Sequence, residues 1–183
     1  RAAGLACVYL AAAAEDFETV VAAERIGCHL VDVRVVLERP ADPAPPPPAA
    51  DADFRIGPGR EDDLPRLEAI ATDVARASRY SADPRFRPEE TERLYRTWIQ
   101  NGWNGYVDAV LVAHGREGEV LGFVCPKMHG ELCDLQLVGV ASAQRQRKVG
   151  RGLISAGIAW ARERGAKRLF GGEFCPLGEI ANP

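Results

Sequence analysis

The chain has 183 residues and a formal net charge of −3 at pH 7, with 46% apolar and 27% charged residues, as in ordinary globular proteins. A negative net charge argues against a nucleic-acid-binding protein that depends on bulk positive charge, so no nucleic-acid partner is expected. No apolar run approaches the ~20 residues of a membrane span, and no membrane segment is expected either.

Residues 1–39 are expected to form a small strand–helix–strand piece. The apolar run Leu5–Leu10 predicts a buried strand. Asp16 can cap a helix that carries apolar residues on one side and stops at Gly27. The valine-rich stretch His29–Leu37 alternates as a strand does. A piece with so small a core is expected to pack on the rest of the chain.

A proline-rich linker, PADPAPPPPAADAD at residues 40–53, separates this piece from a main part at residues 54–183. Hydrophobic periodicity and turn residues predict the elements of the main part. In order, these are a strand Phe54–Gly57, a helix Glu61–Ser78, a helix from Pro88, strands Ala109–His114, Val120–Met128 and Glu131–Ala141, a helix ending at Gly165, and a strand Ala166–Gly172.

This order of elements predicts a mixed α/β fold of the α+β type. Its mainly antiparallel sheet would be flanked by helices, with one crossover after Ala141. The repeated alternation of strand and helix that marks a doubly wound fold is missing from the pattern. Pro126 predicts that its strand bends or reaches an edge of the sheet.

The cysteines and histidines show no spacing typical of a metal site, since the sequence contains no C-x-x-C pair. We therefore expect no metal and reduced cysteines that pack as small apolar residues in a cytoplasmic protein. The cysteines are Cys7, Cys28, Cys125, Cys133 and Cys175.

The basic stretch QRQRKVGRGL at residues 144–153 lies between a predicted strand and a predicted helix. The first N–H groups of a helix lack partners and lie at the positive pole of its dipole, so an anionic group can bind there. Two glycines allow close approach and four cations supply charge, which suits a pyrophosphate; a solvated basic turn is the alternative. These residues are Gly150, Gly152, Arg145, Arg147, Lys148 and Arg151.

Neither a mononucleotide G-x-x-x-x-G-K-[ST] loop nor a dinucleotide G-x-G-x-x-G motif is present. The stretch resembles the acyl-coenzyme-A motif [RQ]-x-x-G-x-[GA] of the GNAT superfamily of N-acetyltransferases. Residues 147–152 match every position but require a longer loop. The ungapped register begins at Arg145 instead and places Lys148 where the first glycine belongs.

Three further stretches are similar to the dTDP-fucosamine acetyltransferase family, whose members use acetyl-CoA to acetylate the 4-amino group of a nucleotide-linked 4-amino-4,6-dideoxyhexose. The stretches are SRYSADPRFRPEETERLYRTWIQN (78–101), GCHLVDVRVVLERP (27–40) and LVGVA (137–141). The resemblance covers most of residues 5–172. It implies a GNAT-like fold in which residues 1–39 form a partial GNAT-like β-α-β subdomain.

The resemblance also implies which residues bind the coenzyme. The backbone of the strand end would pair with the pantetheine arm, and the basic loop would hold the pyrophosphate of acetyl-CoA. The strand residues are Val138, Gly139, Val140 and Ala141, and the loop residues are Arg145, Arg147, Lys148, Val149, Gly150, Arg151 and Gly152.

The acceptor side is implied in the same way. Arg79, Tyr80 and Arg85 lie in the segment that would line the acceptor pocket, and a loop salt bridge is the alternative for the two arginines. Amine attack on a thioester needs a base, and Glu131 or Asp134 are the candidates. Surface carboxylates at a strand end are the alternative for these two.

The family usually places its general acid, a tyrosine, in a helix after the fifth strand. The segment EFCPLGEIANP at residues 173–183 does not match that pattern. The C-terminal end of the fold is therefore expected to be missing, and the chain as given is expected to be inactive or impaired.

The resemblance thus implies an acetyl-CoA-dependent N-acetyltransferase that acts on a small-molecule primary amine. The acceptor that it favours is the amine of a nucleotide-linked amino-deoxy sugar. The alternatives are another amine, such as an aminoglycoside or a peptide N-terminus, and a non-catalytic fragment that binds coenzyme A. A second copy of the chain, in a homodimer, is a further expected partner.

Overall fold

The computed structural model describes residues 7–43 and 53–176, with only the backbone of residues 172–176. Residues 44–52 of the predicted linker and the tail 177–183 lie outside this description. The chain divides into two compact units, Arg1–Val31 and Asp32–Pro183. The boundary between these units lies before the strand Asp32–Pro40, whereas the predicted boundary, after residue 39, lies at the end of that strand.

The small unit contains helix α1 (Phe17–Arg25), as predicted. The Asp16 carboxylate accepts a hydrogen bond from the Thr19 N–H at 3.1 Å, and Gly27 leaves the helix with a φ of +88°. The predicted strand Leu5–Leu10 is wrong over its described residues 7–10, which have no regular structure. No residue of α1 is buried.

The large unit begins with the valine-rich strand that was predicted at His29–Leu37 and that is found at Asp32–Pro40, and it follows the predicted order from Phe54 onward. Its strands are β1 (Asp32–Pro40), β2 (Phe54–Pro58), β3 (Leu111–Gly115), β4 (Val120–His129), β5 (Leu132–Val140) and β6 (Arg168–Pro176). Its helices are η1 (Glu61–Asp63), α2 (Leu64–Ala75), α3 (Arg79–Ala82), α4 (Pro88–Asn101), η2 (Gly102–Tyr106), η3 (Ser142–Gln144) and α5 (Val149–Glu163).

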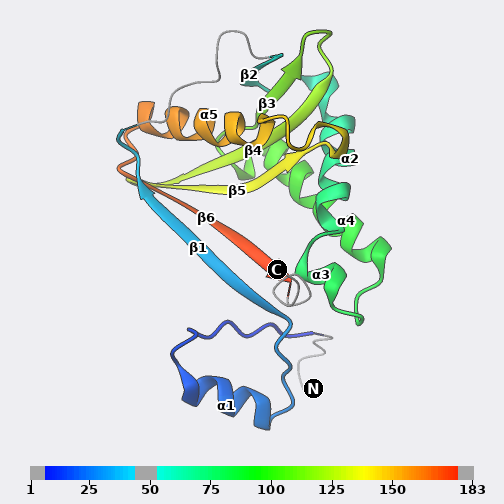
Figure 1. Cartoon of the computed structure of the whole chain (residues 1–183), viewed down its shortest axis with the longest axis vertical. Helices are drawn as coiled ribbons and strands as arrows, with labels where there is room; N and C mark the ends of the chain where they lie inside the picture. Colours follow the sequence, from blue (N-terminus) through cyan, green and yellow to red (C-terminus); the bar gives the residue numbers. More distant parts are fainter. Residues whose placement is uncertain (1–6, 44–52, 177–183) are drawn as a thin grey trace. The chain divides into compact units, whose positions relative to one another are not determined.

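All six strands belong to one sheet in the order β1-β6-β5-β4-β3-β2 (Figure 1). Only β5 and β6 are parallel, because α5 makes the crossover between them, and every other pair is antiparallel. The predicted mixed, mainly antiparallel sheet is confirmed. The predicted linker starts inside this sheet, since Pro40 ends β1 and Ala41 is buried.

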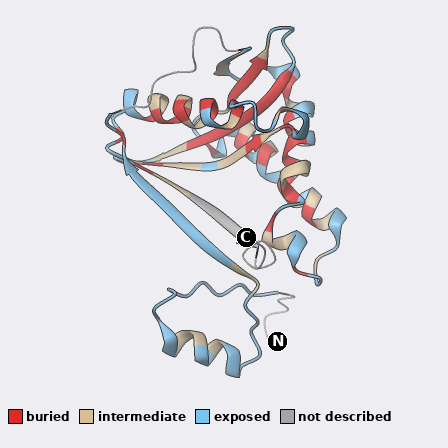
Figure 2. Cartoon of the chain, in the orientation of Figure 1, coloured by how far each residue is buried: buried red, intermediate tan, exposed pale blue. Residues whose placement is uncertain are grey.

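Helices cover both faces of the middle of the sheet, which explains why β4 is buried along most of its length (Figure 2). On one face, Leu67 and Ile70 of α2 and Ile99 of α4 belong to one buried cluster with Phe123. On the other face, Leu153 of α5 belongs to a second cluster with Val124, the next residue of β4.

Pro126 lies in this interior strand rather than at an edge, and it is buried. The pairing register of β4 with β5 shifts between Cys125 and Pro126, because Pro126 has no N–H to donate. The predicted irregularity is therefore confirmed, whereas the alternative of an edge position is wrong. Cys125 and Cys133 are buried as expected, but Cys7 and Cys28 are exposed.

Candidate active site

The basic loop leads from β5 through η3 into α5, and its backbone has unusual geometry. Gln146 and Lys148 have φ values of +62° and +66°, in the left-handed region that favours glycine. Lys148 is the N-cap of α5, no side chain caps this helix end, and the Gly152 N–H is bonded to the Lys148 carbonyl at 3.0 Å. The N–H groups of the first turn are therefore not capped by a side chain, an arrangement in which a helix N terminus can bind an anion.

This geometry favours the ungapped register of the motif. In that register Lys148 takes the place of the first glycine, and its positive φ is what a glycine would adopt there. Gly150 then takes the second place, where an added Cβ would meet only Val140 Cγ2 at 3.5 Å. Gly152 serves packing instead, since a Cβ there would lie 2.9 Å from Phe54.

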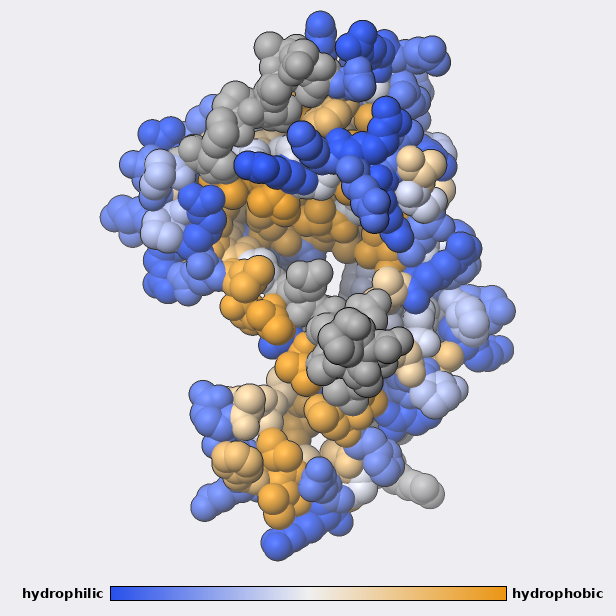
Figure 3. Space-filling view, in the orientation of Figure 1, coloured by the Kyte–Doolittle hydropathy of each residue, from blue (hydrophilic) through white to orange (hydrophobic). Residues whose placement is uncertain are grey.

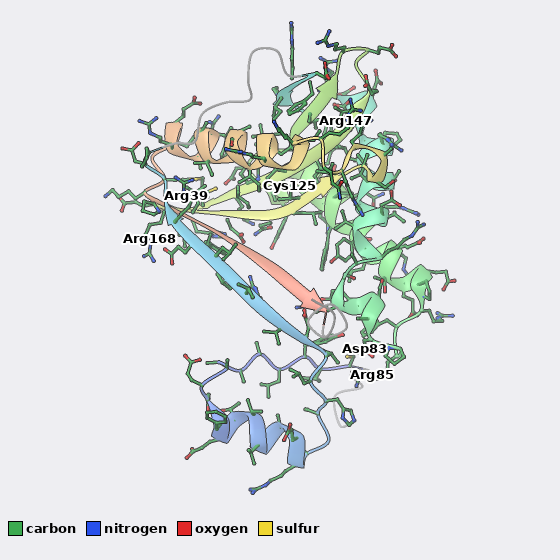
Figure 4. All side chains as sticks on the ribbon, viewed as in Figure 1. Arg39, Asp83, Arg85, Cys125, Arg147 and Arg168 are labelled. Carbon is green, nitrogen blue, oxygen red and sulfur yellow. The ribbon has the colours of Figure 1, made fainter. Side chains whose placement is uncertain are left out.

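An open hollow of about 300 Å³ lies at this helix end. Six predicted coenzyme residues line it, namely Val140, Arg145, Lys148, Val149, Gly150 and Arg151, together with Gln144 and Gln146, which sequence reasoning missed. Arg147 is not among them: its guanidinium donates to Gln144 Oε1 at 2.9 Å (Figure 4). The hollow therefore combines helix N–H groups that no side chain caps with three cationic side chains, and such a combination of donors and positive charge suits a pyrophosphate.

Among the described strands, none pairs with the β6 side of β5 from Leu135 to Val140, which is six of its nine residues. Strand β5 pairs with β6 only from Leu132 to Asp134, after which the two strands diverge, as Figure 1 shows. On its other side β5 stays paired with β4 up to Val140. Predicted residues Val138, Gly139 and Val140 thus lie on the open stretch, and Ala141 follows it, its N–H bonded to the Leu121 carbonyl at 2.9 Å. An extended ligand could pair with this edge as an added strand.

The two candidate bases differ in environment. Glu131 lies in the β4–β5 turn, exposed, with its carboxylate 2.6 Å from Lys167 Nζ. Asp134 lies where β5 and β6 diverge, and burial raises the pKa of its carboxyl above the usual range, while Gln136, His129 and Arg34 oppose this shift. Asp134 is therefore the better base by environment.

The predicted acceptor segment is partly helical and internally bonded. Arg85 forms a bidentate pair with the buried Asp83, through contacts of 2.8 and 2.7 Å (Figure 4). Arg79 donates to the Tyr80 hydroxyl at 2.8 Å and lies over its ring. The loop salt bridge that was the alternative interpretation of the two arginines is therefore present for Arg85, with Asp83 as its partner.

Aromatic side chains hold this segment against α4. The Tyr80 ring meets Phe86 and Trp98 edge-on, with ring centroids 5.6 and 6.0 Å apart, and Tyr95 lies 4.7 Å from Trp98. Burial raises the pKa of the Tyr95 hydroxyl, against the lowering effects of Ser78 and Arg79. Tyr95 was not predicted as a site residue, because the arrangement of Tyr80, Tyr95 and Trp98 depends on how two separate elements pack.

Other kinds of site find no support in residues 7–43 and 53–176. Within these ranges no three His, Cys, Asp or Glu side chains are grouped so that they could hold a metal ion. Nor does any helix there combine the length and apolar character needed to span a bilayer. Burial raises the pKa of the Cys125 thiol to about 12 and that of Cys133 to about 11, which makes both poor nucleophiles.

Known proteins resemble the chain in sequence and in fold. A dTDP-fucosamine acetyltransferase from Escherichia coli O6:H1 is 28% identical over 115 residues, which cover 60% of this chain and 47% of that protein. A GCN5-related N-acetyltransferase from Sphaerobacter thermophilus superposes with a TM-score of 0.61 at 15% identity, covering 90% of this chain and 49% of the other. A glucosamine N-acetyltransferase region of a fungal multi-domain β-N-acetylglucosaminidase gives 0.63 at 14% identity, covering 90% of this chain and 22% of the other.

The chain thus spans about half the length of the curated relative that it matches. The family model of the GNAT acetyltransferases matches residues 74–173, which include the basic loop, the open stretch of β5 and the start of β6. Because this match covers more than half of the sequence, the chain belongs to the GNAT acetyltransferase family.

Proposed function

We propose that this protein is an acetyl-CoA-dependent N-acetyltransferase and that its acceptor is the primary amine of a nucleotide-linked amino-deoxy sugar. Acetyl-CoA is the acyl donor of the GNAT family. The observation that carries the proposal is the uncapped, basic N terminus of α5 directly beyond the open stretch of β5. The helix N terminus would bind the pyrophosphate of the coenzyme, and the adjacent open strand edge would pair with the extended, amide-bearing arm that follows it.

Within this proposal, the loop and strand hold the coenzyme. Arg145, Lys148 and Arg151, with the first N–H groups of α5, bind the pyrophosphate. The backbone of Val138 to Val140 pairs with the pantetheine arm and directs an N–H toward the acyl oxygen. When bound, acetyl-CoA supplies an activated thioester.

Asp134 is the residue that we assign as general base. Its half-buried carboxyl, with a raised pKa, can accept the proton of the acceptor ammonium directly or through a water. Glu131 is a poorer candidate because it forms an exposed ion pair with Lys167. The general acid is not assigned to any described residue.

The sugar-nucleotide acceptor rests on the relative from Escherichia coli, whose name states an amino-sugar substrate, and on the match to it over 60% of this chain. The segment with Arg79, Tyr80 and Arg85 would line the acceptor pocket. Either arginine would have to exchange an existing partner to contact a phosphate of the acceptor, Asp83 in the case of Arg85 and the Tyr80 hydroxyl in the case of Arg79.

The coenzyme site is tested by Gly150→Asp. A carboxylate at this position faces the bound pyrophosphate, and like charges in contact cost several kcal/mol, so the Kd for acetyl-CoA is expected to rise at least about 30-fold. The melting temperature should not fall, because an acidic residue in the first turn of a helix is favourable.

The matched control is Gly57→Asp, which adds the same charge on β2 where a Cβ meets no neighbour. Isothermal titration calorimetry gives both Kd values. An unchanged Kd in Gly150→Asp, or an equal loss in the control, would show that acetyl-CoA does not bind at this loop.

The acceptor is tested by thiol release from acetyl-CoA with a panel of amines. Turnover with dTDP-linked 4-amino-4,6-dideoxyhexoses, and little with aminoglycosides or peptide N-termini, is the expected result. Turnover with another amine class would replace the acceptor assignment. Coenzyme binding without turnover for any amine would favour the non-catalytic alternative for this chain.

A further inference from the structure

Strand β1 forms one border of the sheet and is exposed on both of its faces (Figure 2). Within residues 7–43 and 53–176, no strand pairs with its outer edge. Four apolar side chains lie along it, Val33, Val35, Val36 and Leu37, with exposed fractions from 38% to 63%. Figure 3 shows this apolar surface along the middle of the strand. A long, apolar, unpaired edge of this kind favours pairing with another strand.

The sequence of β1, DVRVVLERP, is complementary to itself in one antiparallel register. Two copies related by a two-fold axis through Val36 would align all nine residues. Arg34 of each copy then faces Glu38 of the other, and this attractive pair occurs twice. Val35 faces Leu37 on the opposite face of the sheet, also twice.

Neighbouring registers lose these pairs. A two-fold axis through Val35 would place Asp32 opposite Glu38, where two carboxylates repel each other. An axis through Leu37 would place Arg34 opposite Pro40 and so lose both pairs of Arg34 with Glu38. Moving the two-fold axis by one residue changes which residues lie opposite each other. Of the three axes, only the one through Val36 both aligns all nine residues and places opposite charges across from each other.

We propose that the outer edge of β1 is the interface of a symmetric homodimer in which the two β1 strands pair antiparallel about Val36. The two six-stranded sheets then form one continuous sheet. The interface does not depend on the proposed acetyltransferase activity.

Sedimentation velocity of the full chain over a dilution series tests the proposal. The wild type should show a reversible monomer–dimer equilibrium. Arg34→Glu and Glu38→Arg should each weaken dimerisation about tenfold or more, because two attractive pairs become two repulsive ones. The double variant Arg34→Glu/Glu38→Arg restores opposite charges and should return dimerisation to near the wild-type level.

Arg66→Glu, on the exposed side of α2, makes the same charge change away from β1 and should leave dimerisation unchanged. A wild type that stays monomeric throughout, or a double variant as weak as the single ones, would overturn the proposal. Glu38 is also paired with Arg168, so a variant can lose part of its fold. Hydrogen exchange of residues 32–40 in the wild type provides an independent test. If the two β1 edges pair, backbone amide exchange in this strand must slow as the protein concentration rises, and an unchanged rate refutes the interface.

Discussion

Lys148 shows how one residue shapes the site. A left-handed backbone costs a residue with a Cβ about 1–2 kcal/mol, and Lys148 adopts it at the N-cap of α5 without a side-chain hydrogen bond to the helix. The strain is local to the loop that would bind the coenzyme, while the lysine side chain adds a positive charge to the hollow. Strain of this kind persists where the surrounding structure imposes it, which is typical of ligand sites.

Asp134→Asn tests the environment of the proposed base. Burial raises the folded-state pKa of Asp134, so its ionisation disfavours the folded state as pH rises from the ordinary value of 3.8 through the folded-state pKa. The variant should therefore melt above the wild type at neutral pH, and the difference should vanish below pH 3.8.

Thermal melting at a series of pH values measures this effect. Glu131→Gln is the control, because it removes only an exposed ion pair worth about 0–1 kcal/mol. A stability gain combined with loss of turnover is expected of a catalytic carboxylate. A gain that stays constant at all pH values would contradict the assigned environment.

At the scale of elements, the start of α2 is fixed to the sheet by a buried polar pair. His114 Nε2 of β3 lies 3.0 Å from Asp63 Oδ2, and the same carboxylate accepts the Arg60 N–H at 2.8 Å. Both side chains are buried. The pair therefore holds η1, and with it the first turn of α2, against β3 at the helix-covered face of the sheet.

His114→Ala is expected to destabilise the protein by about 1–3 kcal/mol, because it leaves the buried Asp63 carboxylate with the Arg60 N–H alone. Urea unfolding measures the loss. His114→Gln keeps a donor on the side chain and should lose less. Equal losses in both variants would mean that packing, and not the hydrogen bond, holds this corner.

Across the whole molecule, stability should be concentrated in the helix-covered part of the sheet. Leu153 of α5 is fully buried against the sheet, whereas Leu37 of β1 is 63% exposed. The β1–β6 ribbon is a two-stranded extension whose outer strand is exposed at nearly every residue. Such ribbons contribute little by themselves.

A matched pair of leucine substitutions checks this distribution. Leu153→Ala is expected to cost about 2–5 kcal/mol through lost burial and a cavity, and Leu37→Ala less than about 0.5 kcal/mol. Urea unfolding at low protein concentration, where β1 pairing between copies is weakest, gives both values. Similar losses of unfolding free energy in the two variants would contradict this prediction, since they would mean that the β1–β6 ribbon is as stable as the helix-covered part of the sheet.

Local patterns in the sequence were enough for most of the main part. Hydrophobic periodicity and turn residues predicted α2, α4 and α5 and strands β3 to β5, because these signals act within one element. The short helix α3 was missed inside a polar segment, since its four residues are too few to show a period. The C-terminal segment that lacks the tyrosine pattern lies mostly outside the described residues.

The sequence by itself determined the family, the order of elements and the loop at which an anion can bind, because motif spacing and helix ends are local properties. Only the tertiary structure decided that β1 joins β6, that β5 and β6 part after Asp134, and that Arg85 is paired with Asp83. The tertiary structure also favours the ungapped register of the loop, through the backbone at Lys148. These features depend on contacts between distant segments, which no periodicity along one segment can specify.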